Sequence, residues 1–101
     1  EVTNGPKKTN VTITYWGPNG ANFEVGAYAN HIEQSGTCTL TLKKGSIVLT
    51  ASRTAIDNVS TMSCGALSVK NSKVTPGTWT ATVKYTSNKY QGSTTKQLEV
   101  Q

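Results

Sequence analysis

The chain has 101 residues, which is enough for one domain with a modest hydrophobic core. Hydrophobic residues make up 35% of it and charged residues only 15%, so the net charge of +5 reflects scarce acidic residues more than basic clusters. No run of five or more like charges occurs, so we expect no nucleic-acid partner. No apolar stretch is long enough to span a membrane.

Residues 1–9 are polar and contain Gly5 and Pro6, a composition typical of a tether. The predicted division is a flexible tether over residues 1–9 and one folded domain over residues 10–101. Attachment to a membrane is expected only through an anchor outside this segment.

The first half of the domain shows the period of two that is typical of strands. Residues 10–15 alternate, which predicts Val11, Ile13 and Tyr15 on an inner face, and residues 17–20 (Gly-Pro-Asn-Gly) predict a turn. A second strand begins near residue 22. Within it, Gly26 predicts a bulge or the close approach of another strand.

The middle of the chain predicts an antiparallel hairpin, with strands at residues 37–43 and 46–51 and a turn at Lys44 and Gly45. Residues 53–57 are ambiguous and are interpreted as a loop. Two short strands are predicted at residues 59–64 and 66–69.

Residues 77–85 predict the central strand of the domain. Trp79, Ala81, Val83 and Tyr85 share one parity, and threonines and Lys84 occupy the other, a pattern that is apolar inside and polar outside. After a turn at residues 87–89, residues 92–100 predict a final strand that pairs back. Seven or eight short strands without a convincing helix predict an all-β fold, an antiparallel β-sandwich.

Cys38 and Cys64 each lie within a strand-like run, with no Cys-x-x-Cys motif and no histidine at ligand spacing. A disulfide between them fits the Thr- and Ser-rich composition of an exported protein, and two reduced, buried cysteines are the alternative. With the disulfide, we expect a secreted or cell-surface location.

The run at residues 76–85 resembles the penultimate strand of bacterial Ig-like, fibronectin-III-like and PKD-like modules. The hairpin beginning at residues 36–42 and the second cysteine before a Val-containing strand are similar to Ig-like ectodomains of exported, pilin-like bacterial surface proteins. The chain departs from antibody-type domains, because its two cysteines are close in sequence and Trp79 follows both. The resemblance implies an Ig-like sandwich that serves display, adhesion or appendage assembly, without catalysis or a cofactor.

The residues that could carry catalysis are dispersed. The five acidic residues lie in separate segments, and no Gly-x-Ser-x-Gly elbow or Gly-rich phosphate loop occurs. His31 with Glu33 could form a metal or acid–base pair, but two ligands do not make a metal site, and we interpret His31 as a solvated loop histidine. We expect no enzymatic activity and no metal.

Three aromatic residues do not fall on the apolar inner face of the predicted strands. They are Trp16, Tyr28 and Tyr90, and we take them as the candidate contact residues. Exposed Trp and Tyr on a β scaffold can stack on sugar rings or anchor a protein partner. The alternative is that Trp16 covers the end of the fold and Tyr90 packs beside its turn. The leading hypothesis is a noncatalytic adhesion or pilus-like assembly module. A carbohydrate-binding module and an inert spacer are the alternatives, and the expected partner is a protein or a cell-envelope glycan.

Overall fold

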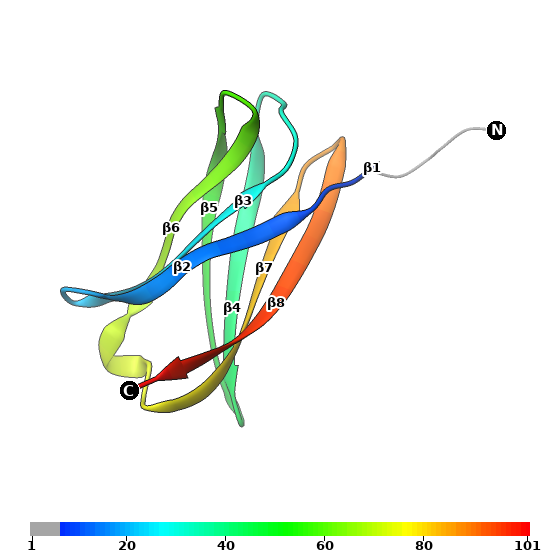
Figure 1. The fold of residues 1–101 in the computed structure, drawn as a ribbon. Coiled ribbons are helices and arrows are strands. Elements are labelled where there is room, and N and C mark those ends of the chain that lie inside the picture. The colour runs from blue at the N-terminus through cyan, green and yellow to red at the C-terminus, as the bar shows by residue number, and fades with distance from the viewer. Residues whose placement is uncertain (1–6) are drawn as a thin grey trace.

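The computed structural model describes residues 7–101 and shows an all-β fold in which eight strands form one curled sheet (Figure 1). Within these residues the one helical segment is a 3-10 turn, and no helix is long and apolar enough to cross a membrane. The all-β class predicted from the alternating pattern is confirmed. The elements are β1 (Lys7–Lys8), β2 (Val11–Asn19), β3 (Asn22–Ala29), β4 (Gly36–Lys44), β5 (Ile47–Asn58), β6 (Thr61–Lys70), η1 (Asn71–Lys73), β7 (Gly77–Thr86) and β8 (Tyr90–Val100).

The strand order is β1-β8-β7-β4-β5-β6-β3-β2, and every neighbouring pair is antiparallel except β1 with β8. β5 connects the two halves of the sheet: Ile47 to Ala55 pair with β4, and only the last residues, from Ile56, pair with β6. β2 comes close to β8, so the sheet curls around a shared interior (Figure 1).

The predicted central strand is confirmed as β7, which lies between β4 and β8. Trp79, Ala81, Val83 and Tyr85 are each 0% exposed and form the middle of the core. The indole N–H of Trp79 donates a hydrogen bond to the backbone oxygen of Thr75 at 2.7 Å. This bond satisfies the only polar atom of that side chain, which makes its complete burial favourable.

The predicted disulfide is present and joins Cys38 of β4 to Cys64 of β6. β5 lies between these strands in the sheet order, so the disulfide crosses the interior of the curl instead of linking hydrogen-bonded neighbours. Both cysteines are 0% exposed, and their Cα atoms are 5.6 Å apart. A cross-link that closes a loop of this length stabilises the fold by roughly 3 kcal/mol in the chain-entropy model.

The prediction that Tyr15 faces inward is wrong. The ladder between β2 and β3 shifts register between Ile13 and Tyr15, and after the shift Tyr15 lies opposite Gly26. A bulge inserts one residue and exchanges the two faces of the strand that follows it. Tyr15 therefore lies on the outer face, 49% exposed, while Val11 stays buried.

Three expected boundaries also differ. β2 continues through residues 17–19, and the turn falls at Gly20 and Ala21. Residues 53–57 belong to β5, because the ladder with β4 continues to Ala55 before the pairing passes to β6. The two short strands expected at residues 59–64 and 66–69 are one strand, β6, bent at Gly65, whose φ of +64° suits glycine.

Of the predicted tether, residues 1–6 lie outside the described residues. Lys7 and Lys8 form β1, paired parallel with Tyr90 and Gln91 of β8. Thr9 is buried, and its backbone N–H donates to the oxygen of Gln91 at 3.0 Å. Residues 7–9 therefore belong to the fold, because their polar backbone groups complete the edge of β8.

Candidate functional site

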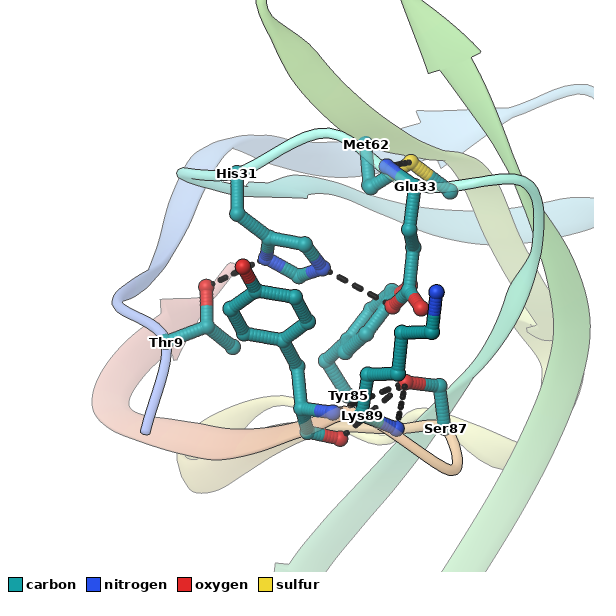
Figure 2. A network of polar contacts seen from close by, with 8 residues as sticks. Thr9, His31, Glu33, Met62, Tyr85, Ser87 and Lys89 are labelled. Atoms are coloured by element: carbon teal, nitrogen blue, oxygen red, sulfur yellow. Dashed lines mark hydrogen bonds and ion pairs between the residues drawn. The ribbon is translucent and has the colours of Figure 1, made fainter. Parts of the chain in front are cut away.

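A network of polar side chains joins three connections at the end of the molecule where β1 meets β8 (Figure 2). Thr9 lies between β1 and β2, His31 and Glu33 lie between β3 and β4, and Tyr85 lies near the end of β7. These residues are far apart in the sequence and converge because their strands end on the same side of the curled sheet.

The groups bond in series. Thr9 Oγ1 lies 2.6 Å from His31 Nδ1, and His31 Nε2 lies 2.9 Å from Glu33 Oε2. The Tyr85 hydroxyl donates to the same carboxylate oxygen. Because a carboxylate only accepts hydrogen bonds, the proton that joins His31 to Glu33 resides on Nε2.

The interpretation of His31 as a solvated loop histidine is wrong. Its side chain is 7% exposed and that of Glu33 is 8% exposed. The ring of Tyr90 stacks on the imidazole with 3.8 Å between centroids and 18° between planes, and Tyr85 meets it edge-on at 4.7 Å. Two aromatic rings, a hydroxyl and a carboxylate thus replace water around the imidazole.

The network also changes the acidity of its members. Burial opposes ionisation of Glu33, but the hydrogen bonds from Tyr85, Ser87 and His31 outweigh burial and lower the pKa of its carboxyl below 4.5. Burial, followed by the hydrogen bond to the Glu33 carboxylate, raises the pKa of the Tyr85 hydroxyl. Glu33 is therefore an anion and Tyr85 a neutral donor at neutral pH.

The turn between β7 and β8 holds Tyr90 in its stacking position. Ser87 Oγ accepts hydrogen bonds from the backbone N–H of Lys89 at 3.1 Å and of Tyr90 at 2.9 Å. The backbone N–H of Ser87 donates to the oxygen of Tyr90 at 2.8 Å. A serine that bonds the backbone two and three residues ahead fixes a tight turn, and Figure 2 shows Ser87 beside Glu33.

A hydroxyl, an imidazole and a carboxylate in series is the arrangement by which proteins activate a nucleophile. Here Thr9 is 9% exposed and the Tyr90 ring covers one face of His31. Every buried side-chain nitrogen or oxygen within residues 7–101 has a hydrogen-bond partner. The geometry consequently ties three connections together, with each polar group satisfied by its neighbours.

Residues 7–101 contain no group of three or more His, Cys, Asp or Glu side chains placed to share a metal ion. The two residues that the sequence offered as a ligand pair, His31 and Glu33, bond to each other through Nε2 and Oε2.

The three aromatic candidates lie in different surroundings. Tyr90 packs on His31. Trp16, 39% exposed, lines a hollow with Phe23 and Val100 at the other end of the fold, and Lys96 Nζ lies 5.2 Å from its ring centroid. Tyr28 is half-buried and lines a separate hollow on the outer face of β3.

That outer-face hollow contains a residue that the sequence pattern missed as a contact residue. Tyr15 lines it together with Tyr28, because the bulge in β2 turns the Tyr15 ring outward. The sequence did contain one signal for this residue. Tyr15 and Trp16 are adjacent, so only one of them can face inward on a regular strand, and the alternating pattern wrongly placed Tyr15 there.

Comparison with known proteins finds no family model that matches the chain and no match among curated proteins or solved structures.

Proposed function

We propose that this protein is a noncatalytic extracellular module that serves adhesion or the assembly of a bacterial surface appendage. The observation that carries the proposal is the set of large apolar side chains left exposed on a cross-linked β scaffold. Exposed apolar groups on a rigid scaffold favour contact with a partner. They are Tyr15, Trp16, Ile32, Ile47, Val48, Ile56 and Val59, with exposed fractions of 39% to 97%.

The disulfide supports an extracellular location, because such bonds persist in oxidising compartments and are reduced in the cytosol of most cells. It also supports a binding role. A cross-link through the core keeps β4 and β6 in fixed positions, and a fixed scaffold lowers the entropy lost when surface groups bind.

The free edge of β5 supports the assembly part of the proposal. From Ile47 to Ala55 this strand pairs with β4 on one side only, and its other edge has no ladder partner among the described residues. Within residues 47–55 Arg53 is the one charged side chain, and its guanidinium donates to the oxygen of Ala66 in β6 at 3.0 Å. A long edge with little charge and no proline can accept an added strand from another chain.

We also propose that the curled sheet is an Ig-like β-sandwich. Two features support this assignment: the parallel pairing of β1 with β8, and the passage of β5 from a ladder with β4 to a ladder with β6. An N-terminal segment that contacts the last strand before crossing to the opposite layer would close such a sandwich.

The noncatalytic part of the proposal rests on the network of Thr9, His31, Glu33 and Tyr85. Its reactive groups bond to one another and the Tyr90 ring covers one face of His31, so a substrate would have to move these groups apart. A structural role for the network requires no such movement.

The test is binding of the fluorescently labelled domain to intact bacterial cells and to their isolated envelope. The proposal predicts saturable binding by the oxidised, folded domain and none by the same protein after reduction and alkylation in denaturant. Equal, non-saturating signals from the two samples would reject adhesion and leave an inert spacer.

A further inference from the structure

The outer face of β2, β3 and β6 carries a shallow hollow of about 450 Å³. In Figure 1 these three strands run side by side at one flank of the curl. The hollow's floor is a row of small residues, since Gly26 of β3 pairs with Ala66 of β6. The aromatic walls are supplied by Tyr15 of β2 and Tyr28 of β3. Tyr15 pairs with Gly26 across the ladder between β2 and β3.

Two irregularities of the sheet create this hollow. One is the register shift in β2 that turns Tyr15 outward, and the other is a shift between β3 and β6 at Ala27 and Tyr28, opposite Gly65. Gly65 has a φ of +64°, a conformation that favours glycine. Bulges bend the strands that carry them and re-aim side chains, and they are over-represented at functional sites.

The Tyr15 ring packs against Gly26 in the floor of the hollow. A Cβ atom at Gly26 would fall 2.1 Å from Tyr15 Cε2, so only glycine at this position lets the ring lie against the backbone. Tyr15 is nevertheless 49% exposed, so part of its side chain is open to solvent. An exposed aromatic ring packed against a sheet is a platform on which a ligand can stack.

The polar part of the lining is uncharged. It consists of hydroxyl groups and carboxamides from Thr14, Asn30, Asn58, Thr61 and Ser63. Among residues 7–101, no Lys, Arg, Asp or Glu side chain lines the hollow. The guanidinium of Arg53 on β5 lies beside it and donates to the oxygen of the lining residue Ala66 at 3.0 Å. Hydroxyl and carboxamide groups both donate and accept hydrogen bonds, so they match a ligand rich in hydroxyl groups.

We propose that this hollow binds a neutral saccharide, with one sugar ring stacked on Tyr15 and its hydroxyl groups bonded by Asn30, Asn58 and the neighbouring hydroxyls. This inference rests on the proposed adhesive function and names its ligand class. A ligand with one apolar face, many hydroxyls and no charge fits the two tyrosines and the uncharged lining together. An added peptide strand fits less well, because β3 already has ladder partners on both sides.

A second hollow of about 460 Å³ provides the contrast for the experiment. It is lined by Lys8 and Lys84 beside Gln91 and Ser93, and two lysines favour an anion. Acidic glycans therefore test for binding elsewhere on the surface, and neutral glycans test the hollow of Tyr15.

The experiment is a binding screen of the oxidised domain against neutral and acidic oligosaccharides, followed by titration of each hit. The variants are Tyr15→Ala, Tyr15→Phe, Gly26→Ala and, as the matched aromatic control, Trp16→Ala. Circular dichroism and thermal unfolding identify any variant that fails to fold. We expect a neutral hit whose Kd rises about tenfold or more in Tyr15→Ala, since removing an anchor residue of a site has an effect of this size.

Tyr15→Phe keeps the ring and is expected to retain binding within about threefold, a small loss compared with that of an anchor residue. Gly26→Ala keeps the tyrosine but displaces its ring, so it is expected to weaken binding as Tyr15→Ala does while remaining folded. Trp16→Ala is expected to bind as the wild type does.

Three results would overturn the inference: hits restricted to acidic glycans, binding lost in Trp16→Ala but kept in Tyr15→Ala, and cell binding by a domain that binds no neutral glycan. The last result would leave the adhesive function intact with another ligand. Absence of both cell binding and glycan binding would reject the function and the inference together.

Discussion

At the scale of single residues, Glu33 is the acid on which the network of Thr9, His31 and Tyr85 depends. Its carboxylate accepts from His31 and Tyr85, and its pKa is lower in the folded protein than the 4.5 of an ordinary glutamate. Replacing it by Gln removes the charge and weakens both bonds. We expect Glu33→Gln to lower the free energy of unfolding at pH 7 by roughly 1–3 kcal/mol, measured by urea denaturation.

The direction of the pH dependence follows from the lowered pKa of Glu33. The folded protein binds this proton less tightly than the unfolded chain, so the stabilisation is fully present above pH 4.5 and is lost as the pH falls through the lower folded pKa. The difference between wild type and Glu33→Gln should therefore shrink in acid. Asp57→Asn, at an exposed carboxyl on β5, is the control. An unchanged difference at pH 3 would contradict this account.

Gly36 and Gly26 form a second residue-scale test, because each lies under a tyrosine. A Cβ atom would fall 2.1 Å from the Tyr85 hydroxyl at Gly36 and 2.1 Å from the Tyr15 ring at Gly26. Tyr85 is fully buried and bonded to Glu33, whereas Tyr15 is 49% exposed and can turn away. We expect Gly36→Ala to destabilise the protein by about 1–3 kcal/mol, and Gly26→Ala by less, in thermal unfolding. A larger loss in Gly26→Ala would contradict the assigned surroundings.

His31 shows where residue-level prediction from the sequence ends. The spacing of His31 and Glu33 was visible, but their burial depends on Thr9, Tyr85 and Tyr90 from three other segments. The sequence of a polar loop is the same whether water or side chains from other segments surround it. Contacts with those other segments bury His31, and the loop sequence alone does not show them.

At the scale of elements, the tight turn between β5 and β6 carries local strain. Val59 at its tip has a φ of +64°, which is unfavourable for a β-branched residue, and its side chain is 97% exposed. Val59→Gly removes the steric penalty and loses no burial. We expect it to raise the free energy of unfolding by roughly 1 kcal/mol after the entropic cost of glycine is subtracted.

Val48→Gly is the matched control for that turn, since Val48 is a half-exposed valine inside β5 whose φ is not positive. Glycine weakens a strand interior, so this variant should lose stability. If both substitutions destabilise the protein equally in urea denaturation, the turn stores no strain.

Strand prediction from the sequence succeeded where alternation is unbroken and failed at irregularities. β4 and β7 keep one parity throughout, and their residue patterns identified them correctly. β2 contains a bulge before Tyr15, and β6 is bent at Gly65. Because one inserted residue reverses the faces, pattern analysis placed Tyr15 inside and divided β6 in two. The candidate saccharide hollow lies between these two irregularities, which is why the sequence did not reveal it.

At the scale of the whole molecule, the disulfide replaces stability that a thin core cannot supply. The closed loop between Cys38 and Cys64 predicts that reduction lowers the free energy of unfolding by roughly 3 kcal/mol. Urea denaturation with and without reductant measures the change, and Cys38→Ala/Cys64→Ala should not respond to reductant. Titratable free thiols in the unreduced protein would contradict the account.

The sequence predicted the class of the whole molecule but not its closure. Alternation identified the strands and the cysteine pair, whereas the curl depends on β5 changing its ladder partner from β4 to β6. Nothing in residues 53–57 distinguishes a loop from a strand that continues on a new partner. Pairing between distant segments settled that point.

The measurement that tests the central claim most directly is a set of cell-binding curves for the wild-type domain, Tyr15→Ala and Trp16→Ala, recorded side by side. The account predicts saturable binding by the wild type and Trp16→Ala and a curve shifted about tenfold or more to weaker affinity for Tyr15→Ala. Three superimposable curves, or a shift in Trp16→Ala alone, would contradict a binding surface on the outer face of β2, β3 and β6.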